Sequence, residues 1–493
     1  MNQKERRKKI ENFEWKKSDF QPTFLLPTPS LSLTEEAEND LALCQKPIDF
    51  FFLLFDEDIQ NHIVSESNIY AEKKGVSLNL TLDEFQNVLG ILFLSGYNKV
   101  PSTRLYWSNE NDIRNDLVAS TMTRNRFFEI IRNIHLAHDH DPNDKLWKLR
   151  PLMDQMLKNF KKYIRMSENV CVDESMIKYF GNHSMKQFIR GKPIRYGYKV
   201  WMLCSSTGQC HHFKMYTGAE ERDPNLGVGE SVVLSMAEFV PSGCHLYMDR
   251  YFTSLNLLKI LAEEKLIPAA GTIQQNRLRG AQNVLMNESS FKKLERGRSE
   301  CATSENVVVT QWRDNKTVTM ASNFVGKLPE GKCIRFSRSE RKDIQIKQPK
   351  VIQLYNKHMG GVDLLDQSIN CYRIGVRIRK WYWSIFTWLL DLACVNSWHA
   401  AKMVGPSSES SAHLLKFRRD LVLSLLSKDV RRKKSSIQSR FFTQHTIVRS
   451  SDGRRLRCKA CKSHTVYKCS TCDLPLDANS CFDTFHFDFS CPC

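Results

Sequence analysis

The sequence lacks any uninterrupted hydrophobic run long enough to cross a membrane. Its most apolar long stretch, Trp381–Val395, is broken by Asp391 and is shorter than the roughly 20 residues that a membrane-spanning helix needs. Residues 1–9 are charged and contain no apolar core, so we expect no signal peptide. These two absences favour an intracellular protein with no membrane partner.

Acidic residues are scarce relative to basic ones. The 493-residue chain has 54 Asp and Glu against 72 Lys and Arg, a formal net charge of +18 that no single basic tail explains. Such an excess is typical of proteins that bind phosphate backbones, because docked Lys and Arg release condensed counterions. An anionic membrane surface is the competing partner, but no basic amphipathic helix stands out. The hydrophobic content of 41% allows a sizeable folded core.

Cysteine is sparse over most of the chain and concentrated near its end. Seven of the 16 cysteines follow residue 457, and the other nine are scattered, as small buried side chains would be. In a reducing compartment this clustering indicates metal binding instead of disulfides. The pairs Cys458/Cys461 and Cys469/Cys472 have two-residue spacers, which let both thiolates of a pair reach one tetrahedral Zn²⁺. We therefore expect this short tail to need zinc to fold.

Hydrophobic periodicity divides the chain into regions. Apolar residues at three- and four-residue spacing in 82–92 and 127–134 predict helices. From residue 169, three strand-like segments are followed by a helix, a strand, a helix and a strand, which predicts a mixed α/β sheet. Val307–Trp312 and Thr317–Ser322 flank a polar turn and predict a hairpin. The sequence contains no internal repeat.

Two short apolar runs of the predicted sheet each end in an aspartate. Val170–Val172 precedes Asp173 and Cys244–Met248 precedes Asp249, so both carboxylates are predicted at strand ends, where functional side chains of α/β sheets project. Carboxylates on neighbouring strand ends can share hard divalent cations such as Mg²⁺. Two such cations activate the attacking oxygen and stabilise the leaving oxygen in phosphodiester chemistry. Each aspartate alone could equally be a turn or cap residue.

A second pair of carboxylates follows a Gly-Gly dipeptide. Asp363 and Asp366 lie three residues apart, a spacing that puts both on one face of a helix. The alternative is that they only occupy the first turn, where the helix dipole favours acidic residues.

Residues 189–199 combine basic and aromatic side chains, which suits phosphate contact and base stacking. A solvated turn between strands would have the same composition. The residues concerned are Arg190, Lys192, Arg195, Tyr196, Tyr198 and Lys199.

Five motifs, in order along the chain, resemble those of the piggyBac transposases and their domesticated relatives. They are Val172-Asp173-Glu174-Ser175-Met176, Phe188-Ile189-Arg190-Gly191-Lys192-Pro193, residues 247–254 from Tyr247 to Ser254, residues 356–366, and Arg379-Lys380-Trp381-Tyr382. The resemblance runs from about residue 45 to the C-terminus. It implies an α/β fold with an RNase H-like (retroviral-integrase-like) catalytic core and a β-rich insertion. It also implies a flanking α-helical dimerisation and DNA-binding region and a C-terminal cross-braced zinc finger.

We accordingly expect seven regions along the chain. They are a disordered polar and basic leader (1–45), the first part of the helical dimerisation and DNA-binding region (46–168), the first part of the catalytic core (169–273), the insertion domain (274–348), the last core helix with the third aspartate (349–370), the second part of the helical region (371–448) and the Cys-rich zinc-finger domain (449–493).

The resemblance also assigns site residues. It implies that Asp173, Asp249 and Asp363 form a catalytic triad that holds Mg²⁺ (or Mn²⁺), with Asp366 as a fourth, supporting aspartate. Trp381 is expected to stack near DNA, although an interface aromatic is the alternative. Gln274 stands where relatives often carry Arg near target DNA, a departure that bears on integration more than on cleavage. The expected DNA-binding residues are Arg190, Lys192, Arg195, Tyr196, Lys199, Arg277, Arg379, Lys380 and Trp381.

The implied activity is cut-and-paste transposition. Metal-activated water nicks at the element end, and the freed 3′-hydroxyl attacks the opposite strand to form a hairpin. After the hairpin is reopened, the 3′ ends join a TTAA target. The expected partners are double-stranded DNA (transposon terminal repeats and TTAA target) and a second copy of the chain, since two ends must be held at once.

The basic runs Lys4–Lys9 and Arg431–Lys434 are candidate nuclear import signals, or ordinary solvated charge runs. A chromosomal substrate favours the nucleus. Two other functions compete with transposition: a domesticated DNA-binding protein that no longer cuts, and a zinc-dependent protein-interaction module on an inert scaffold.

The tail resembles the family's RING- or PHD-like finger, which binds two zinc ions and reads the transposon ends. Asp477 stands where the family places Cys or His, so one or two ions are expected. Cys491 and Cys493 could supply missing ligands or be free thiols. A RING-like shape also fits a ubiquitin ligase, but basic residues beside the finger favour DNA. The expected zinc ligands are Cys458, Cys461, Cys469, Cys472, Asp477, Cys481, His486 and Cys491.

Overall fold

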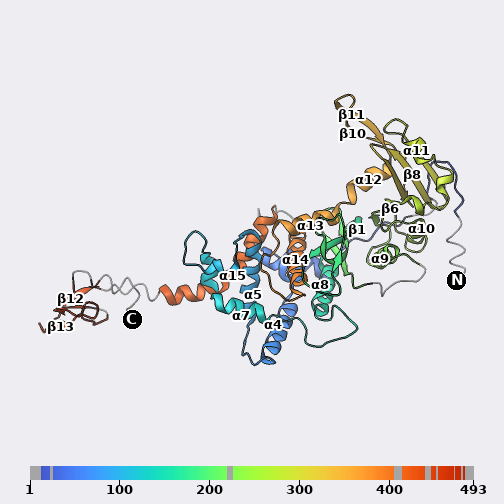
Figure 1. Cartoon of the computed structure of the whole chain (residues 1–493). Coiled ribbons are helices and arrows are strands. Elements are labelled where there is room, and N and C mark those ends of the chain that lie inside the picture. Colours follow the sequence, from blue (N-terminus) through green and yellow to red (C-terminus); the bar gives the residue numbers. More distant parts are fainter. Residues whose placement is uncertain are drawn as a thin grey trace. The chain divides into compact units, whose positions relative to one another are not determined.

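The computed structural model of the chain (Figure 1) falls into two compact units, residues 1–426 and 427–493. The predictions for Lys4–Lys9, His486, Cys491 and Cys493 lie outside the described residues. These described residues are 13–22, 26–218, 226–404, 413–438, 446–450, 453–470, 472–478 and 481–482.

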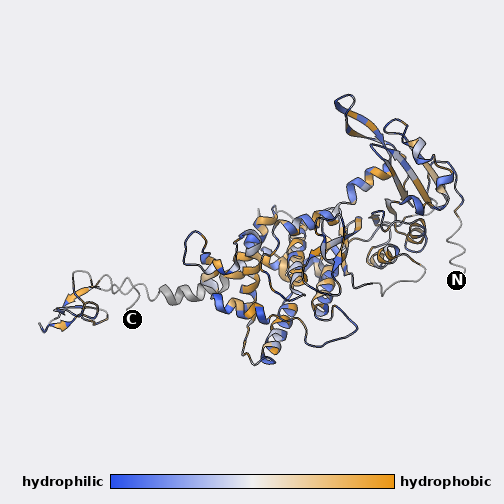
Figure 2. Cartoon of the chain, viewed as in Figure 1, coloured by the Kyte–Doolittle hydropathy of each residue, from blue (hydrophilic) through white to orange (hydrophobic). Residues whose placement is uncertain are grey.

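Helices from distant parts of the sequence pack together in the first unit. Helix α3 (Pro47–Leu54) contacts both α8 (Arg150–Tyr163) and α14 (Trp383–Val404). Helix α14 is hydrophobic nearly all round, as Figure 2 shows, and most of its residues are buried, as expected for a helix surrounded by others. No helix within the described part of the chain is long and apolar enough to cross a bilayer.

The predicted helices in 82–92 and 127–134 are confirmed as α5 (Leu82–Tyr97) and α7 (Arg124–Asn133). The start of α5 is stabilised because the Thr81 hydroxyl accepts from Glu84 N while the Glu84 carboxylate accepts from Thr81 N. The expectation of a disordered leader is wrong for α2 (Glu35–Leu43), whose first residues the Thr34 hydroxyl caps. The remaining helical elements of this part are α4 (Glu57–Glu72), η1 (Thr103–Trp107), α6 (Asp116–Thr121) and α15 (Leu414–Gln438).

Among the described residues, nine strands form one mixed sheet with the order β2-β3-β1-β5-β6-β9-β8-β7, and β4 pairs with β3. Strand β1 is antiparallel to β3 and parallel to β5, and β5 is parallel to β6. The predicted succession of three strands, helix, strand, helix and strand is confirmed, with the two-residue strand β2 as an addition that was not predicted. The elements are β1 (Asn169–Lys178), β2 (Gln187–Phe188), β3 (Tyr196–Ser205), β4 (Cys210–Met215), α9 (Val228–Ala237), β5 (His245–Met248), α10 (Leu255–Glu263) and β6 (Ala269–Thr272).

Successive side chains of β1 point alternately into two hydrophobic layers, one on each face of the sheet. Val170 and Val172 pack with residues of α9 and α10 on one face of the sheet. Cys171 faces the other way and belongs to the cluster that includes Leu365 of α13 (Gly361–Cys371). The sheet therefore lies between α9 and α10 on one side and α13 on the other.

Three strands of the region 274–348 continue the same sheet. Strand β9 (Thr317–Ser322) pairs antiparallel with β6, and β8 (Val307–Arg313) forms the predicted hairpin with β9. Asp314 in the β8–β9 turn binds Arg296 and Arg335 at 2.6 and 3.0 Å. Arg335 belongs to a separate two-stranded ribbon of β10 and β11. The other elements here are η2 (Gln275–Arg277), η3 (Ala281–Asn283), α11 (Glu288–Phe291), β7 (Ser299–Ser304), β10 (Gly331–Ser337), β11 (Lys342–Gln348) and α12 (Lys350–His358).

A buried ion pair joins α14 to α15. Asp391 is 0% and Arg418 is 2% exposed, and a carboxylate oxygen lies 2.8 Å from the guanidinium. The carboxylate also accepts from Ile374 N, in the segment between α13 and α14, and Arg418 Nε donates to Phe93 O in α5. The pair thereby holds four segments together at a point where neither charge reaches water.

We expect Asp391→Ala to lower the free energy of unfolding by about 3–5 kcal/mol, because it leaves the Arg418 charge buried without a partner. Denaturant unfolding of the full chain measures this loss. The double variant Asp391→Ala with Arg418→Met removes both charges and should recover much of the stability. A double variant as unstable as the single one would contradict this interpretation.

Candidate active site

Asp173 lies within β1 and not at its end as predicted. The strand continues to Lys178 and pairs with β3 along its length. The apolar run stops at Val172 because Asp173 and Glu174, which are only partly buried, interrupt it before burial resumes at Ser175. Asp249 does follow directly after β5. Since Val172 pairs with Met248 in the parallel register, Asp173 and Asp249 are the next residues on adjacent strands.

A glycine brings helix α13 against this point of the sheet. A methyl group at Gly361 would collide with Ser205 O of β3 and lie 2.9 Å from the Cys171 sulfur. The backbone N–H groups of Gly361 and Val362 also act on that sulfur and tend to lower the pKa of its thiol, although burial raises it overall. The start of α13 therefore sits directly on β1 and β3, which brings the two carboxylates of α13 towards the sheet.

Asp363 and Asp366 differ in their surroundings on α13. Asp366 is partly buried and accepts a hydrogen bond of 2.6 Å from Ser175 Oγ, two residues beyond Asp173 on the same face of β1. Asp363 is more exposed, one turn nearer the start of the helix. The four aspartates thus come from β1, the end of β5 and α13.

Burial, with smaller contributions from the nearby Glu174 and Asp249, raises the pKa of Asp173 to about 7. Burial also raises the pKa of Asp249, and that of Asp366 to about 6. Like charges that share a partly dry site disfavour ionisation of one another, and a nearby cation removes that penalty. The cluster therefore has the electrostatics of a cation site.

The donor set suits a hard divalent cation. Carboxylate oxygens are the ligands that Mg²⁺ prefers. One oxygen of Asp173 accepts from Glu174 N and one of Asp249 accepts from Tyr251 N, each at 2.8 Å, which fixes both side chains locally. Within the described part of the chain, the aspartate oxygens do not form a set of three within 4.8 Å of one another. A shared ion therefore requires the side chains to rotate towards it.

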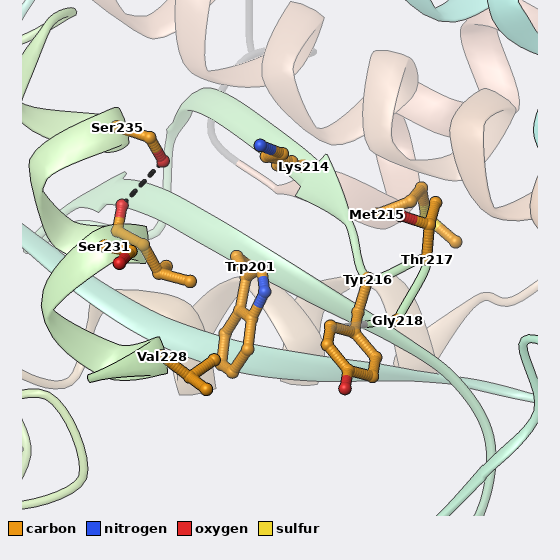
Figure 3. A pocket seen from close by; sticks show the side chains of 10 residues that line it. Trp201, Lys214, Met215, Tyr216, Thr217, Gly218, Val228, Ser231 and Ser235 are labelled. Carbon is orange, nitrogen blue, oxygen red and sulfur yellow. Dashed lines mark hydrogen bonds between the residues drawn. The ribbon is translucent and has the colours of Figure 1, made fainter. Parts of the chain in front are cut away.

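Basic and aromatic side chains flank the carboxylates. Lys192 pairs with Glu174 at 3.1 Å, and Lys199 Nζ lies 3.8 Å from the centre of the Trp201 ring and 4.9 Å from that of Tyr251. Figure 3 shows Trp201 at a small pocket that Val228 and Ser231 also line. None of the four aspartates lines this pocket, so it is distinct from the carboxylate cluster.

Two of the predicted DNA-binding residues donate hydrogen bonds to the protein backbone. Arg277 Nη1 donates to the carbonyl oxygens of Tyr251 (3.0 Å) and Thr253 (2.9 Å), so this side chain braces the turn after Asp249. Lys380 is partly buried and donates to Ile134 O at 2.8 Å.

The other predicted DNA-binding residues lie on or near the surface. Arg190, Arg195 and Arg379 are exposed, and Tyr196 is 45% exposed beside the 57% exposed Phe188. Trp381 is partly buried and stacks on His183 with ring centres 4.3 Å apart. Gln274 precedes η2 at the end of β6, one strand away from Asp249.

A second cluster lies in the unit of residues 427–493. Cys458, Cys461 and Cys481 place their sulfur atoms within 4.8 Å of one another. Asp477 N donates to the Cys458 sulfur at 3.3 Å, so the described contact of Asp477 is made by its backbone. Three convergent thiols are a suitable ligand set for zinc.

The two Cys pairs have the same turn geometry. Lys462 N donates to Cys458 O and Asp473 N donates to Cys469 O, at 3.1 and 3.0 Å. Lys462 and Asp473 both have a positive φ, at 64° and 54°. Cys472 N also donates to the Cys469 sulfur at 3.5 Å. The second pair is therefore shaped like the first, although the described residues bring no third ligand to it.

Three contributors to the carboxylate site had no assigned role in the sequence. Glu174 and Ser175 follow Asp173, and the period of two along a strand could have placed Ser175 on the same face. Gly361 could have been recognised as a close-contact position only from its collision with β3, which depends on residues far away in sequence.

Comparison with known proteins gives a consistent picture. A family described as Transposase IS4 matches residues 46–398. The human PiggyBac transposable element-derived protein 3 is 35% identical over 94% of this chain and 79% of its own length. The human PiggyBac transposable element-derived protein 2 is 33% identical over 96% of this chain and 81% of its own length.

A solved structure has a similar fold. It is the cryo-EM structure of the piggyBac transposase synaptic complex with hairpin DNA, with a TM-score of 0.69 at 20% identity, over 90% of this chain and 96% of that chain.

Gly361→Ala should lower the free energy of unfolding by about 1–3 kcal/mol, because the added methyl pushes α13 away from β3 and Cys171. Thermal or denaturant unfolding measures the effect. Gly360→Ala is the matched control, since a methyl there meets nothing within 4 Å and its φ of −76° suits any residue. Equal stability of the two variants would argue against the close contact.

Proposed function

Because the chain belongs to the piggyBac transposase family, we propose that it is a DNA transposase that cleaves and joins DNA strands with divalent metal ions. The observation that carries this proposal is the convergence of Asp173, Asp249, Asp363 and Asp366 from three separate elements. Partly buried like-charged carboxylates at adjacent strand positions are costly in a structural role, whereas a metal-dependent reaction requires them.

In this proposal Asp173, Asp249 and Asp363 hold Mg²⁺ or Mn²⁺. The bound ions would activate the attacking oxygen and stabilise the leaving oxygen of the phosphodiester. Asp366 accepts a hydrogen bond from Ser175, and this contact positions α13 and with it Asp363. Arg277 stabilises the turn after Asp249, because it donates hydrogen bonds to carbonyl oxygens of that turn.

The proposed reaction is cut-and-paste transposition. A nick at the element end frees a 3′-hydroxyl, which attacks the opposite strand to form a hairpin, and the reopened 3′ ends join a TTAA target. The fold supports an RNase H-like core, since an antiparallel β1-β3-β4 unit is followed by two parallel strands, each reached through a helix.

Double-stranded DNA is the proposed partner. The exposed Arg190, Arg195 and Arg379 supply cations, and the exposed Tyr196 supplies an aromatic face. A homodimer and nuclear localisation are part of the same proposal, since two element ends on a chromosome must be held together.

We further propose that residues 449–493 form a zinc finger that contacts DNA. Cys458, Cys461 and Cys481 skip the pair Cys469/Cys472, and this alternation supports cross-bracing between two zinc ions. Arg454, Arg455 and Arg457 lie beside the first pair and are exposed, which favours a nucleic acid over a protein partner.

A second candidate function is a domesticated DNA-binding protein that no longer cuts. It is favoured by the names of the two human relatives, which describe them as derived from transposable elements. The first prediction below separates the two functions.

We expect Asp249→Asn to reduce Mg²⁺-dependent strand cleavage by on the order of 10³-fold, because losing a metal ligand forfeits several kcal/mol of transition-state stabilisation. The assay uses DNA that carries the element's own terminal repeats. Asp139→Asn, at a 97% exposed side chain, is the control and should cleave like the wild type. If the wild type is as inactive as Asp249→Asn, the second function holds instead.

Cys461→Ser should lower the zinc content of the purified chain and unfold residues 446–482, because the tail has only a small core of its own. Metal analysis by mass spectrometry and limited proteolysis measure the two effects. Cys371→Ser, which changes an exposed thiol on α13, should alter neither. An unchanged zinc content in Cys461→Ser would refute the ligand assignment.

A further inference from the structure

Three lysines from three separate segments face a shared aromatic floor in the first unit. Lys74 follows α4, Lys148 precedes α8, and Lys380 lies between α13 and α14. Their ammonium groups lie over the rings of Tyr70 and Tyr382. We call this group, Lys74, Lys148 and Lys380 with Tyr70, His135 and Tyr382, the lysine cluster.

The ring contacts show how closely these lysines approach one another. Lys74 Nζ is 4.1 Å and Lys380 Nζ 5.3 Å from the centre of Tyr70. Lys148 Nζ is 5.1 Å and Lys380 Nζ 5.7 Å from the centre of Tyr382. Lys380 therefore lies between the other two cations, and each neighbour shares a ring with it.

His135 completes the floor of the cluster. Its ring stacks on Tyr70 at 4.0 Å and meets Tyr382 edge-on at 6.2 Å. The side chain is only 6% exposed, and its Nδ1 has no hydrogen-bond partner. Its backbone is held by Ser67 Oγ, which accepts from His135 N at 3.0 Å. The cluster is thus built on a rigid aromatic base.

Within the described residues, no carboxylate pairs with any of these three lysines. The nearby Glu66 is buried and bonded to His138 at 2.8 Å. Burial, together with Lys74 and Lys148, lowers the pKa of Lys380 to about 7. Burial and Lys74 lower the pKa of Lys148 as well. Three uncompensated cations around the same two rings repel one another, and a bound anion would relieve that repulsion.

We propose that Lys74, Lys148 and Lys380 bind one backbone phosphate of the DNA, which rests on the proposed transposase function. A lysine ammonium has three donors, and Lys380 gives one of them to Ile134 O, so two remain for a phosphate oxygen. Tetrahedral oxyanions accept from several directions at once, which suits three converging ammonium groups. An acidic peptide is a less suitable ligand, because planar carboxylates are better matched by Arg than by Lys.

The cluster adjoins the surface already assigned to DNA. Trp381, next to Lys380, accepts a hydrogen bond through its carbonyl from Tyr198 Oη. Tyr198 pairs with Ile177 on β1, which lies ~13 Å along the strand from Asp173. A duplex carries one negative charge per roughly 1.7 Å of its axis, so one DNA segment can reach both sites.

The test measures binding of the full chain to a short random-sequence duplex over a range of salt concentrations. The double variant Lys74→Gln/Lys148→Gln should reduce the slope of log K against log salt by about 1 to 2 and weaken binding similarly for all sequences. Lys402→Gln is the matched control, because the exposed Lys402 also lies over an aromatic ring, at 3.8 Å from Trp398. It should leave the slope at the wild-type value.

A double variant with the wild-type slope would overturn the proposal. If inorganic phosphate then raises the melting temperature of the wild type but not that of the variant, the cluster is a free-phosphate site. If the double variant does not fold, the single Lys74→Gln variant, which changes an exposed side chain, should still reduce the slope.

The salt-dependence test of the lysine cluster and the cleavage test of the proposed function can fail independently. Asp249→Asn should keep the wild-type salt slope, since the measurement involves no strand cleavage. A wild type that does not cleave DNA, together with a reduced slope in the lysine variant, would therefore refute only the enzyme. A wild type that cleaves DNA, together with an unchanged slope in the lysine variant, would refute only the phosphate contact.

Discussion

Close contact between the start of α13 and strands β1 and β3 is the constraint on which the candidate active site depends. It brings Asp363 and Asp366 to Asp173, although a long stretch of chain, including eight further strands of the sheet, separates them. Gly361 allows the approach, and the Cys171 sulfur and Ser175 hydroxyl make the polar contacts across it. Without this contact, the third and fourth carboxylates would have no fixed position relative to the first two.

Charge is distributed unevenly around this contact. Carboxylates concentrate at β1, β5 and α13, where burial raises the pKa of Asp173 and Asp366. Uncompensated ammonium groups concentrate at Tyr70 and Tyr382 in the helical part. Metal ions at the carboxylates would offset the local excess of negative charge. Phosphates at the lysines would offset the local excess of positive charge. The proposed polyanionic substrate, if it spans both sites, would account for both excesses of charge.

Local patterns in the sequence predicted much of the fold. The three- and four-residue spacing of apolar residues correctly predicted α5 and α7, and the order of strands and helices from residue 169 was also correct. The predicted position of Asp173 at the end of its strand was wrong, because two partly buried carboxylates interrupt the apolar run while β1 continues to pair with β3 as far as Lys178. The β6–β9 pairing, the bonds of Lys380 and Arg277 to backbone carbonyls, and the lysine cluster all depend on contacts between distant segments, which periodicity cannot predict.

The central claim is that Asp173, Asp249 and Asp363 hold divalent ions. Titration of the full chain with Mn²⁺, followed by electron paramagnetic resonance, tests it without requiring DNA or turnover. The wild type should bind one or two Mn²⁺ ions that Mg²⁺ displaces, and Asp173→Asn should lose at least one of them while Asp139→Asn keeps them. Equal Mn²⁺ binding by the wild type and Asp173→Asn would contradict the claim.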